Sequence, residues 1–329
     1  MILIFNDKYD KYYFKTMKNF EKFFDIDSLC IIDLLSSKIN KFKKTNVILT
    51  GASGFLGSNF CSFFYNLNKT FSKKDKIKIY AFDNFIRGKP FWFERYENSE
   101  NFEIINSDIA NNKNFPNADF IIHAASIASP IFYRKYPIQT MDTNVIGLRN
   151  LLDHTLKHNC KSFIFFSTSE IYGDPDPKNI PTKENYRGFV SSTGPRACYD
   201  ESKRYGETLC INFYQQYKIP IKIIRPFNNY GPGLSLNDGR VITDFFKNIL
   251  LNENINLFSD GNATRTFCYV SDAIYGFLLV LLSEHNGEVF NIGNSSPEIS
   301  IKNLAYKMIN LTNVNCKIKT VENHDPHYL

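Results

Sequence analysis

Tyr199 and Lys203 stand four positions apart and have the residue types of an acid–base pair. An α-helix completes a turn in ~3.6 residues, so a helix here would place both side chains on one face. A tyrosine normally titrates near ~10, and a neighbouring ammonium lowers this pKa by favouring the phenolate. The pair therefore suits proton transfer near neutral pH, although an ordinary surface helix can carry the same spacing. The surrounding chain has to decide between these alternatives.

The elements that would position this pair begin after Thr45. A short apolar run, 46–50, leads into a glycine-rich turn, 51–57, which is followed by apolar residues at helical spacing. Strand, glycine turn and helix in this order are typical of a dinucleotide-binding unit, because glycine lets the backbone approach a pyrophosphate and the helix N-terminus attracts its charge. The residues predicted to bind the cofactor here are Gly51, Gly54, Phe55, Leu56 and Gly57.

Asp83 ends the next apolar run and lies 26 residues after Gly57, near the place of a ribose-binding acid. Its carboxylate would accept a hydrogen bond from a 2′-hydroxyl and repel a 2′-phosphate, which favours NAD over NADP. Arg87 tempers this prediction, because a nearby arginine can accommodate the phosphate. The alternative role for Asp83 is that of a turn residue at a strand end.

Further apolar runs at 118–125, 162–167 and 222–226 have the composition of parallel strands buried on both faces. Helix-length segments separate them, including 142–159. This alternation predicts an α/β fold with a doubly wound parallel sheet.

Taken in order, these segments resemble the extended short-chain dehydrogenase/reductase family, whose members are NAD(P)-dependent epimerases, dehydratases and decarboxylases of nucleotide sugars. The resemblance runs from about Thr45 to at least Asn294. It implies a Rossmann domain over 45–329, with an interleaved, smaller C-terminal substrate lobe from about residue 226. It also implies bound NAD, a nucleotide-sugar substrate, which we expect to be UDP-linked, and a homodimer.

The resemblance also implies individual roles. Asn144 in the Thr-Asn-Val segment would support the site. Further cofactor contacts would come from Asn84, Asp108, Ile109, Ala124 and Ala125, together with Tyr199 and Lys203. Substrate contacts would come from Ser126, Asn228, Arg240 and Arg265. An arginine fork suits phosphate oxygens, whereas the alternative for each of the two arginines is a solvated surface position.

Within the family, the chain is most similar to the UDP-glucuronate decarboxylases, in segments 126–130, 167–175, 194–204 and 237–241. Ser202 replaces the usual glycine of this group. The related 4,6-dehydratases carry an Asp-Glu pair where this chain has Ser169-Glu170, and a serine hydroxyl cannot replace a carboxylic acid near neutral pH. The 4-epimerases usually have no glutamate at this position. The pair therefore favours decarboxylation.

The implied catalytic residues are Thr168, Glu170, Tyr199 and Lys203. Tyr199 would remove the proton of the sugar 4-hydroxyl while hydride leaves C4 for NAD, and Thr168 would hold the same oxygen. The resulting ketone is β to the carboxylate, so carbon dioxide can leave, and hydride return regenerates NAD. Glu170 would position the substrate or manage protons. The alternatives are an epimerase or dehydratase acting on another nucleotide sugar, and a non-catalytic NAD-binding member of the family.

Composition indicates a soluble, cytoplasmic enzyme. The chain has 329 residues, 43% of them hydrophobic, and no apolar run reaches the ~18 residues of a membrane span. Its formal net charge of +6 comes from scattered lysines, which argues against nucleic-acid binding. Seven cysteines without a Cys-x-x-Cys pattern and six histidines without ligand spacing predict no disulfide framework and no metal site.

The two ends of the chain differ from the family pattern. Residues 1–44 precede the family segment and predict a helical extension, because apolar residues recur between Phe20 and Asn40. Family members usually continue beyond the Asp-Pro that corresponds to Asp325-Pro326, whereas this chain stops at Leu329. We therefore expect a lobe that is truncated at the C-terminus; the alternatives are a lobe completed differently and a substrate that is not a uronic acid. In the decarboxylases an arginine beyond this point helps to bind the substrate carboxylate.

Overall fold

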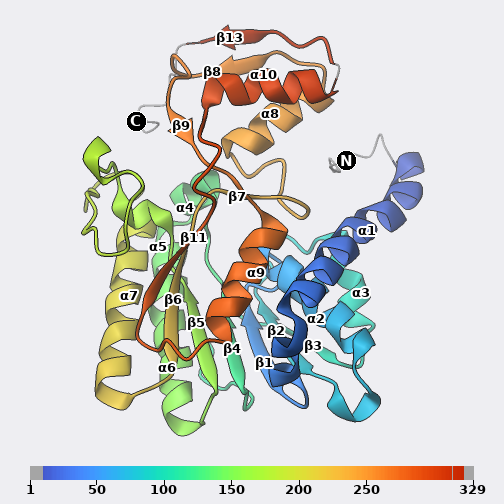
Figure 1. Ribbon diagram of the computed structural model, residues 1–329, viewed down its shortest axis with the longest axis vertical. Coiled ribbons are helices and arrows are strands. Elements are labelled where there is room, and N and C mark those ends of the chain that lie inside the picture. The colour runs from blue at the N-terminus through green and yellow to red at the C-terminus, as the bar shows by residue number, and fades with distance from the viewer. Residues whose placement is uncertain (1–9, 313, 322–329) are drawn as a thin grey trace.

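The centre of the molecule is a seven-stranded parallel sheet with the strand order β11-β6-β5-β4-β1-β2-β3 (Figure 1). The computed structural model describes residues 10–312 and 314–321. The strands are β1 (Asn46–Thr50), β2 (Lys78–Asp83), β3 (Phe102–Asn106), β4 (Phe120–His123), β5 (Ser162–Phe166), β6 (Ile221–Pro226) and β11 (Val289–Ile292). The chain order reverses between β1 and β4, and ligands of such sheets bind outside the carboxyl ends of the strands at this point.

Helices cover both faces of the sheet, as the apolar strand runs predict. Alternate strand residues face two separate cores, for example Leu49 on one side and Ile48 on the other. The first core is closed by α2 (Phe55–Thr70) and α9 (Val270–Leu281), and the second by α6 (Leu148–Lys157) and α7 (Ala197–Tyr217). The prediction of a doubly wound α/β fold is therefore confirmed.

A long helix, α1 (Asp10–Leu35), precedes the sheet and lies across α2 and α9 (Figure 1). Ser28 Oγ donates to Ser62 Oγ of α2 at 2.9 Å, and Asn66 Nδ2 of the same helix donates to Asp25 Oδ1 at 2.7 Å. Ile31 and Leu35 enter the first core. A 3₁₀ helix, Ser36–Phe42, connects α1 to β1. The predicted N-terminal extension thus completes the cover of one sheet face.

A second, smaller layer lies beyond the carboxyl ends of the strands (Figure 1). It has its own apolar core, which includes Phe245, Leu257 and Met308. Its elements are α8 (Val241–Leu250), β8 (Ile255–Leu257), β9 (Thr264–Arg265), β12 (Ile299–Ser300), α10 (Ile301–Thr312) and β13 (Ile318–Thr320). Between β9 and β12 the chain returns to the sheet as α9 and β11, so this lobe is interleaved with the larger domain. Two short strands, β7 (Asn229–Tyr230) and β10 (Cys268–Tyr269), pair where the chain passes between the lobe and the larger domain. Asp325-Pro326 lies outside the described residues.

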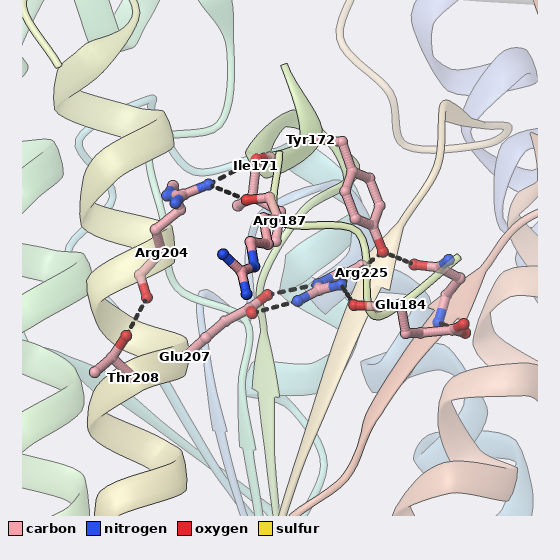
Figure 2. Close-up of polar contacts among 9 residues, drawn as sticks. Ile171, Tyr172, Glu184, Arg187, Arg204, Glu207, Thr208 and Arg225 are labelled. Atoms are coloured by element: carbon pink, nitrogen blue, oxygen red, sulfur yellow. Dashed lines mark hydrogen bonds and ion pairs between the residues drawn. The ribbon is translucent and has the colours of Figure 1, made fainter. Parts of the chain in front are cut away.

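A buried ion pair joins α7 to the sheet (Figure 2). Arg225 of β6 donates to both carboxylate oxygens of Glu207, at 2.8 and 2.6 Å. The same guanidinium donates to Tyr172 Oη at 2.6 Å and to the Glu184 carbonyl at 2.8 Å. Arg204, one helical turn before Glu207, donates to the carbonyl of Ile171. Helix α7 is therefore held against both β6 and the loop that follows β5.

Removing the Glu207 charge should destabilise the fold strongly. Glu207→Gln leaves the Arg225 guanidinium buried without a counter-charge, and breaking a buried pair in this way costs about 3–5 kcal/mol. Urea unfolding of wild type and variant measures the loss. Glu201→Gln on the same helix is the matched control, because its 3.7 Å pair with Arg204 is exposed and is expected to contribute less than about 1 kcal/mol. Equal losses in the two variants would contradict the structural role given to Glu207.

Candidate active site

The glycine-rich turn after β1 closes tightly against two neighbouring segments. Gly51 has a φ of +71°, and a Cβ there would lie 2.7 Å from the Cα of Ala125. A Cβ on Gly57 would lie 2.0 Å from the carbonyl oxygen of Gly51. Helix α2 starts at Phe55, directly after Gly54, and its first N–H groups lack partners within the helix. Bare backbone and a helix N-terminus together fit a dinucleotide pyrophosphate.

Asp83 lies beside this turn at the end of β2. Its Oδ2 accepts from the Ser53 amide at 2.9 Å, and its Oδ1 accepts from the Phe85 amide at 2.8 Å. Each carboxylate oxygen can accept a further bond, as a ribose requires. Arg87, the residue that tempered the choice of cofactor, donates to the buried Asp238 at 2.9 Å. Because Arg87 is neutralised there, Asp83 favours the 2′-hydroxyl of NAD.

The other predicted cofactor positions line the same edge of the sheet. Asn84 Nδ2 donates to Asp108 Oδ2 at 3.3 Å, and Ile109 is buried beneath them. Ala124 and Ala125 follow β4, and the Ala125 amide donates to Thr50 Oγ1 at 3.2 Å. These predicted cofactor residues therefore lie at the carboxyl edge of the sheet, where ligands of such folds bind in a crevice.

Two buried hydroxyls in this crevice have no hydrogen-bond partner among the described residues. They are Ser126 Oγ after β4 and Ser167 Oγ after β5. A buried polar atom without a partner is unfavourable, and such atoms in a native structure are few. Ser126 follows β4, which borders the point where the sheet order reverses, and Ser167 follows β5, the neighbour of β4. Their unused hydrogen-bonding capacity fits a crevice built to receive polar ligands.

Tyr199 and Lys203 lie on one face of α7, as their spacing predicts. Both are buried, and Lys203 Nζ lies 5.9 Å from the centre of the Tyr199 ring. The Lys203 ammonium donates to the Phe166 carbonyl at the end of β5, at 2.7 Å. Burial lowers the pKa of Lys203 to about 7. The alternative of a solvated surface helix is excluded for this pair.

The expected cause of a low tyrosine pKa is not observed. Burial raises the pKa of Tyr199 to about 12, and the hydrogen bond with Thr168 and the charge of Arg240 oppose this rise. The prediction that Lys203 lowers this pKa is therefore wrong for the structure as it stands. The physical reason is that the Phe166 carbonyl holds the ammonium, whose own burial favours its neutral form.

Thr168 and Glu170 belong to a tight turn after β5. Thr168 Oγ1 accepts from the Glu170 amide at 3.2 Å and caps the 3₁₀ helix Ser169–Tyr172. The Glu170 carboxylate pairs with Arg196, whose Nε lies 3.4 Å from Asp200 Oδ2. Arg196 is absent from the predicted site. Its position three residues before Tyr199, close to one helical turn, is the sequence signal that could have identified it.

Asn144, predicted to support the site, does so through a residue that departs from the family pattern. It is fully buried in a π-helical segment, Thr143–Gly147, and its Nδ2 donates to Ser202 Oγ at 2.9 Å. Ser202 Oγ in turn donates to the Cys198 carbonyl at 2.6 Å. The hydroxyl of Ser202 therefore adds a side-chain link between α7 and the π-helical segment.

The predicted substrate residues divide into two groups. Arg240 lies close enough to affect Tyr199 electrostatically, and its Nε is 2.8 Å from Asp238 Oδ2. Asn228 Nδ2 donates to the Thr266 carbonyl at 3.0 Å. Arg265 is exposed on β9, and its Nη1 donates to the adjacent Thr264 carbonyl. Arg240 thus lies near Tyr199, whereas no described contact ties Arg265 to it.

Two surveys of the chain gave negative results. No group of three or more His, Cys, Asp or Glu side chains that could hold a metal ion occurs in residues 10–312 and 314–321. Over that same part of the chain, no helix combines the length and the apolar character that crossing a membrane requires.

The family model for the NAD dependent epimerase/dehydratase family matches residues 47–293. The chain belongs to this family. UDP-glucuronic acid decarboxylase 6 of Arabidopsis thaliana is 36% identical over 286 residues, which are 86% of this chain and 80% of that relative. UDP-glucuronic acid decarboxylase 1 of Xenopus tropicalis is 36% identical over 263 residues, which are 80% of this chain and 58% of that relative.

Solved structures show the same epimerase/dehydratase fold. The UDP-glucuronic acid 4-epimerase of Bacillus cereus, in complex with UDP-glucuronic acid and NAD, superposes with a TM-score of 0.70 at 26% identity, over 84% of this chain and 86% of that one. The UDP-N-acetylglucosamine 4-epimerase of Methanobrevibacter ruminantium M1 has a TM-score of 0.74 at 26% identity, over 87% and 88% of the two chains. The expected family and its NAD dependence are confirmed.

As a member of the NAD dependent epimerase/dehydratase family, the chain should lose its cofactor when the glycine turn is blocked. Gly57→Ala puts a methyl group 2.0 Å from the Gly51 carbonyl, so α2 has to move away. We expect NAD affinity, measured by isothermal titration calorimetry, to fall by roughly 100-fold or more, since each ~1.4 kcal/mol is tenfold. Gly194→Ala is the control, because Gly194 is not among the predicted cofactor residues and a Cβ there would lie 3.2 Å from its nearest neighbour, the Ser191 side chain. Similar affinities for the two variants would contradict the close approach.

Lys203 should make stability depend on pH. Its pKa is about 7 in the folded chain against 10.5 in the reference state, so between these values the unfolded chain binds more protons and folding becomes more favourable as pH rises. We expect Lys203→Met to be most stabilised relative to wild type at or below about pH 7. This advantage should shrink by up to about 1.4 kcal/mol per pH unit towards about pH 9.5. Urea unfolding across this range measures the effect, and the exposed Lys157→Met should give a flat difference.

Proposed function

We propose that this chain is an NAD-dependent decarboxylase of a UDP-linked uronic acid, UDP-glucuronate. The observation that carries the proposal is the turn after β5, where Ser169 replaces the acid of a dehydratase while Glu170 is retained beside the buried Tyr199. The curated relatives that bear the decarboxylase name support it, since they match over 86% of the chain.

Different residues of the site would bind the sugar hydroxyl and accept its proton. Thr168 lies close enough to Tyr199 to oppose the rise in its pKa, so a sugar hydroxyl placed against both would meet an anchor and a proton acceptor. Bound NAD would supply the hydride acceptor, the hydride donor and a positive charge. A phenol with a pKa of about 12 is almost fully protonated near neutral pH, so Tyr199 needs added positive charge to act as a base. Arg240 already contributes some of that charge.

Decarboxylation needs less acid–base help than dehydration. A carboxylate β to a carbonyl leaves as carbon dioxide when its bonding electrons move into an enolate, and no proton has to be given to the departing group. The enolate must still take a proton at C5, in place of the lost carboxylate, before hydride returns to C4. One carboxylate at the turn, Glu170, would orient the sugar or manage this proton, which is supplied by water. A serine at 169 is compatible with this chemistry and removes the acid that water elimination would use.

We also propose that two copies associate through α5 (Pro137–Asp142) and α7. Both helices expose large apolar side chains to solvent, and such patches commonly mark association surfaces. These side chains are Ile138 and Met141 on α5, Ile146 in the π-helical segment that follows α5, and Tyr205 on α7. Light scattering after gel filtration should give the mass of a dimer, and Ile138→Glu should give that of a monomer.

The proposed reaction is tested with purified protein, NAD and UDP-glucuronate. We expect carbon dioxide and a UDP-pentose, identified by mass spectrometry. Tyr199→Phe should lower the rate by about 10²–10⁴-fold, because it removes the proton-transferring hydroxyl. Tyr217→Phe, at the exposed end of the same helix and outside the proposed association surface, is the matched control and should retain activity. A product of unchanged mass would indicate epimerisation, and loss of water would indicate dehydration; either result overturns the proposal.

A further inference from the structure

Arg196 joins the residues of the active site that carry negative charge. It precedes α7, pairs with the Glu170 carboxylate, and lies 3.4 Å from Asp200 through its Nε. Its guanidinium is 6.0 Å from the centre of the Tyr133 ring, which stacks on Tyr199 at 5.3 Å. Arg196 therefore lies near the side chains that surround Tyr199, although it takes no part in the proton transfer proposed for that residue.

Two members of the cluster are partly exposed and the third is nearly buried. The side chains of Arg196 and Glu170 are 42% and 41% exposed, whereas that of Asp200 is 10% exposed. Asp200 Oδ1 is buried without a partner among the described residues. Arg196 thus presents a partly free face at the position where Glu170 would meet a sugar.

Charge makes this arrangement matter for an acidic sugar. Glu170 and Asp200 carry two carboxylates near Tyr199, and Arg196 is the cation that pairs with both. A sugar carboxylate that approached Glu170 without Arg196 would be repelled, because like charges a few ångströms apart interact strongly in a partly buried site. A sugar with a neutral hydroxymethyl group would meet no such repulsion.

We propose that Arg196 is a positioning and specificity-determining residue, which holds Glu170 and offsets its charge so that a nucleotide sugar bearing a carboxylate can bind. This inference rests on the proposed function, since it concerns the same site. Arg196 acts through Glu170 and does not itself exchange a proton with the sugar. Arg196 thereby lets the carboxylate of the sugar approach Glu170 and Tyr199.

The test compares two ligands that differ at one carbon. Affinities of the NAD-loaded protein for UDP-glucuronate and UDP-glucose are measured by isothermal titration calorimetry. We expect Arg196→Met to weaken UDP-glucuronate binding by on the order of tenfold, a modest figure because Glu170 is partly solvent-screened, and to change UDP-glucose binding little. Arg196→Lys should recover part of the loss. Arg149→Met is the matched control, because it removes an i,i+4 pair with Asp153 on the exposed side of α6.

A double variant separates a charge effect from a loss of structure. If Glu170 repels the ligand once Arg196 is gone, Arg196→Met with Glu170→Gln should bind UDP-glucuronate better than Arg196→Met alone. Equal losses for both ligands, no loss for either, or no recovery in the double variant would each overturn the proposal. Should Arg196→Met fail to fold, Arg196→Gln and Arg196→Lys provide the same comparison.

Failure of this inference is distinguishable from failure of the proposed function. Wild-type protein that binds UDP-glucuronate and releases no carbon dioxide overturns the decarboxylase proposal, while the ratio of the two affinities still decides the role of Arg196. Wild-type protein that binds UDP-glucose and not UDP-glucuronate overturns both.

Discussion

The hydrogen bond from the buried Lys203 ammonium to the Phe166 carbonyl organises the active site. It ties the catalytic helix to the last residue of β5, at 2.7 Å. Ser167 and Thr168 come directly after Phe166. The same hydrogen bond therefore helps to fix the distance between the turn after β5 and Tyr199. Together with the hydrogen bond from Arg204 to the Ile171 carbonyl, this contact positions the hydroxyls of Thr168 and Tyr199, which a sugar oxygen would have to engage together.

Burial of the groups that do chemistry has an electrostatic consequence. It lowers the pKa of Lys203 and raises that of Tyr199, so both lean towards their neutral forms. Groups with perturbed pKa values are common at functional sites. A low dielectric there strengthens the interaction of these groups with a charged ligand. The Arg225–Glu207 pair keeps α7 in place behind them, and its two hydrogen bonds satisfy the charges that it buries.

Asp238 connects the two layers of the molecule. It is buried, and it pairs with Arg87 from the loop after β2 and with Arg240 from the start of the substrate lobe. Ser129 Oγ also donates to its backbone carbonyl at 2.7 Å. One carboxylate thereby orients an arginine on the cofactor side and another on the sugar side. The lobe is consequently attached to the loop after β2 through this carboxylate.

The sequence by itself determined the fold and much of the site. Apolar runs, glycines and their order are local signals, and they predicted the strands, the turn at Gly51 and the helix that aligns Tyr199 with Lys203. The partner of a charged side chain is not a local property. Tertiary structure alone decided that Arg87 is neutralised by Asp238, 151 residues away, and that Arg196 reaches Glu170, 26 residues away. It also decided the pKa of Tyr199, because burial depends on everything packed around the ring, whereas spacing along a helix reveals only which neighbour is near.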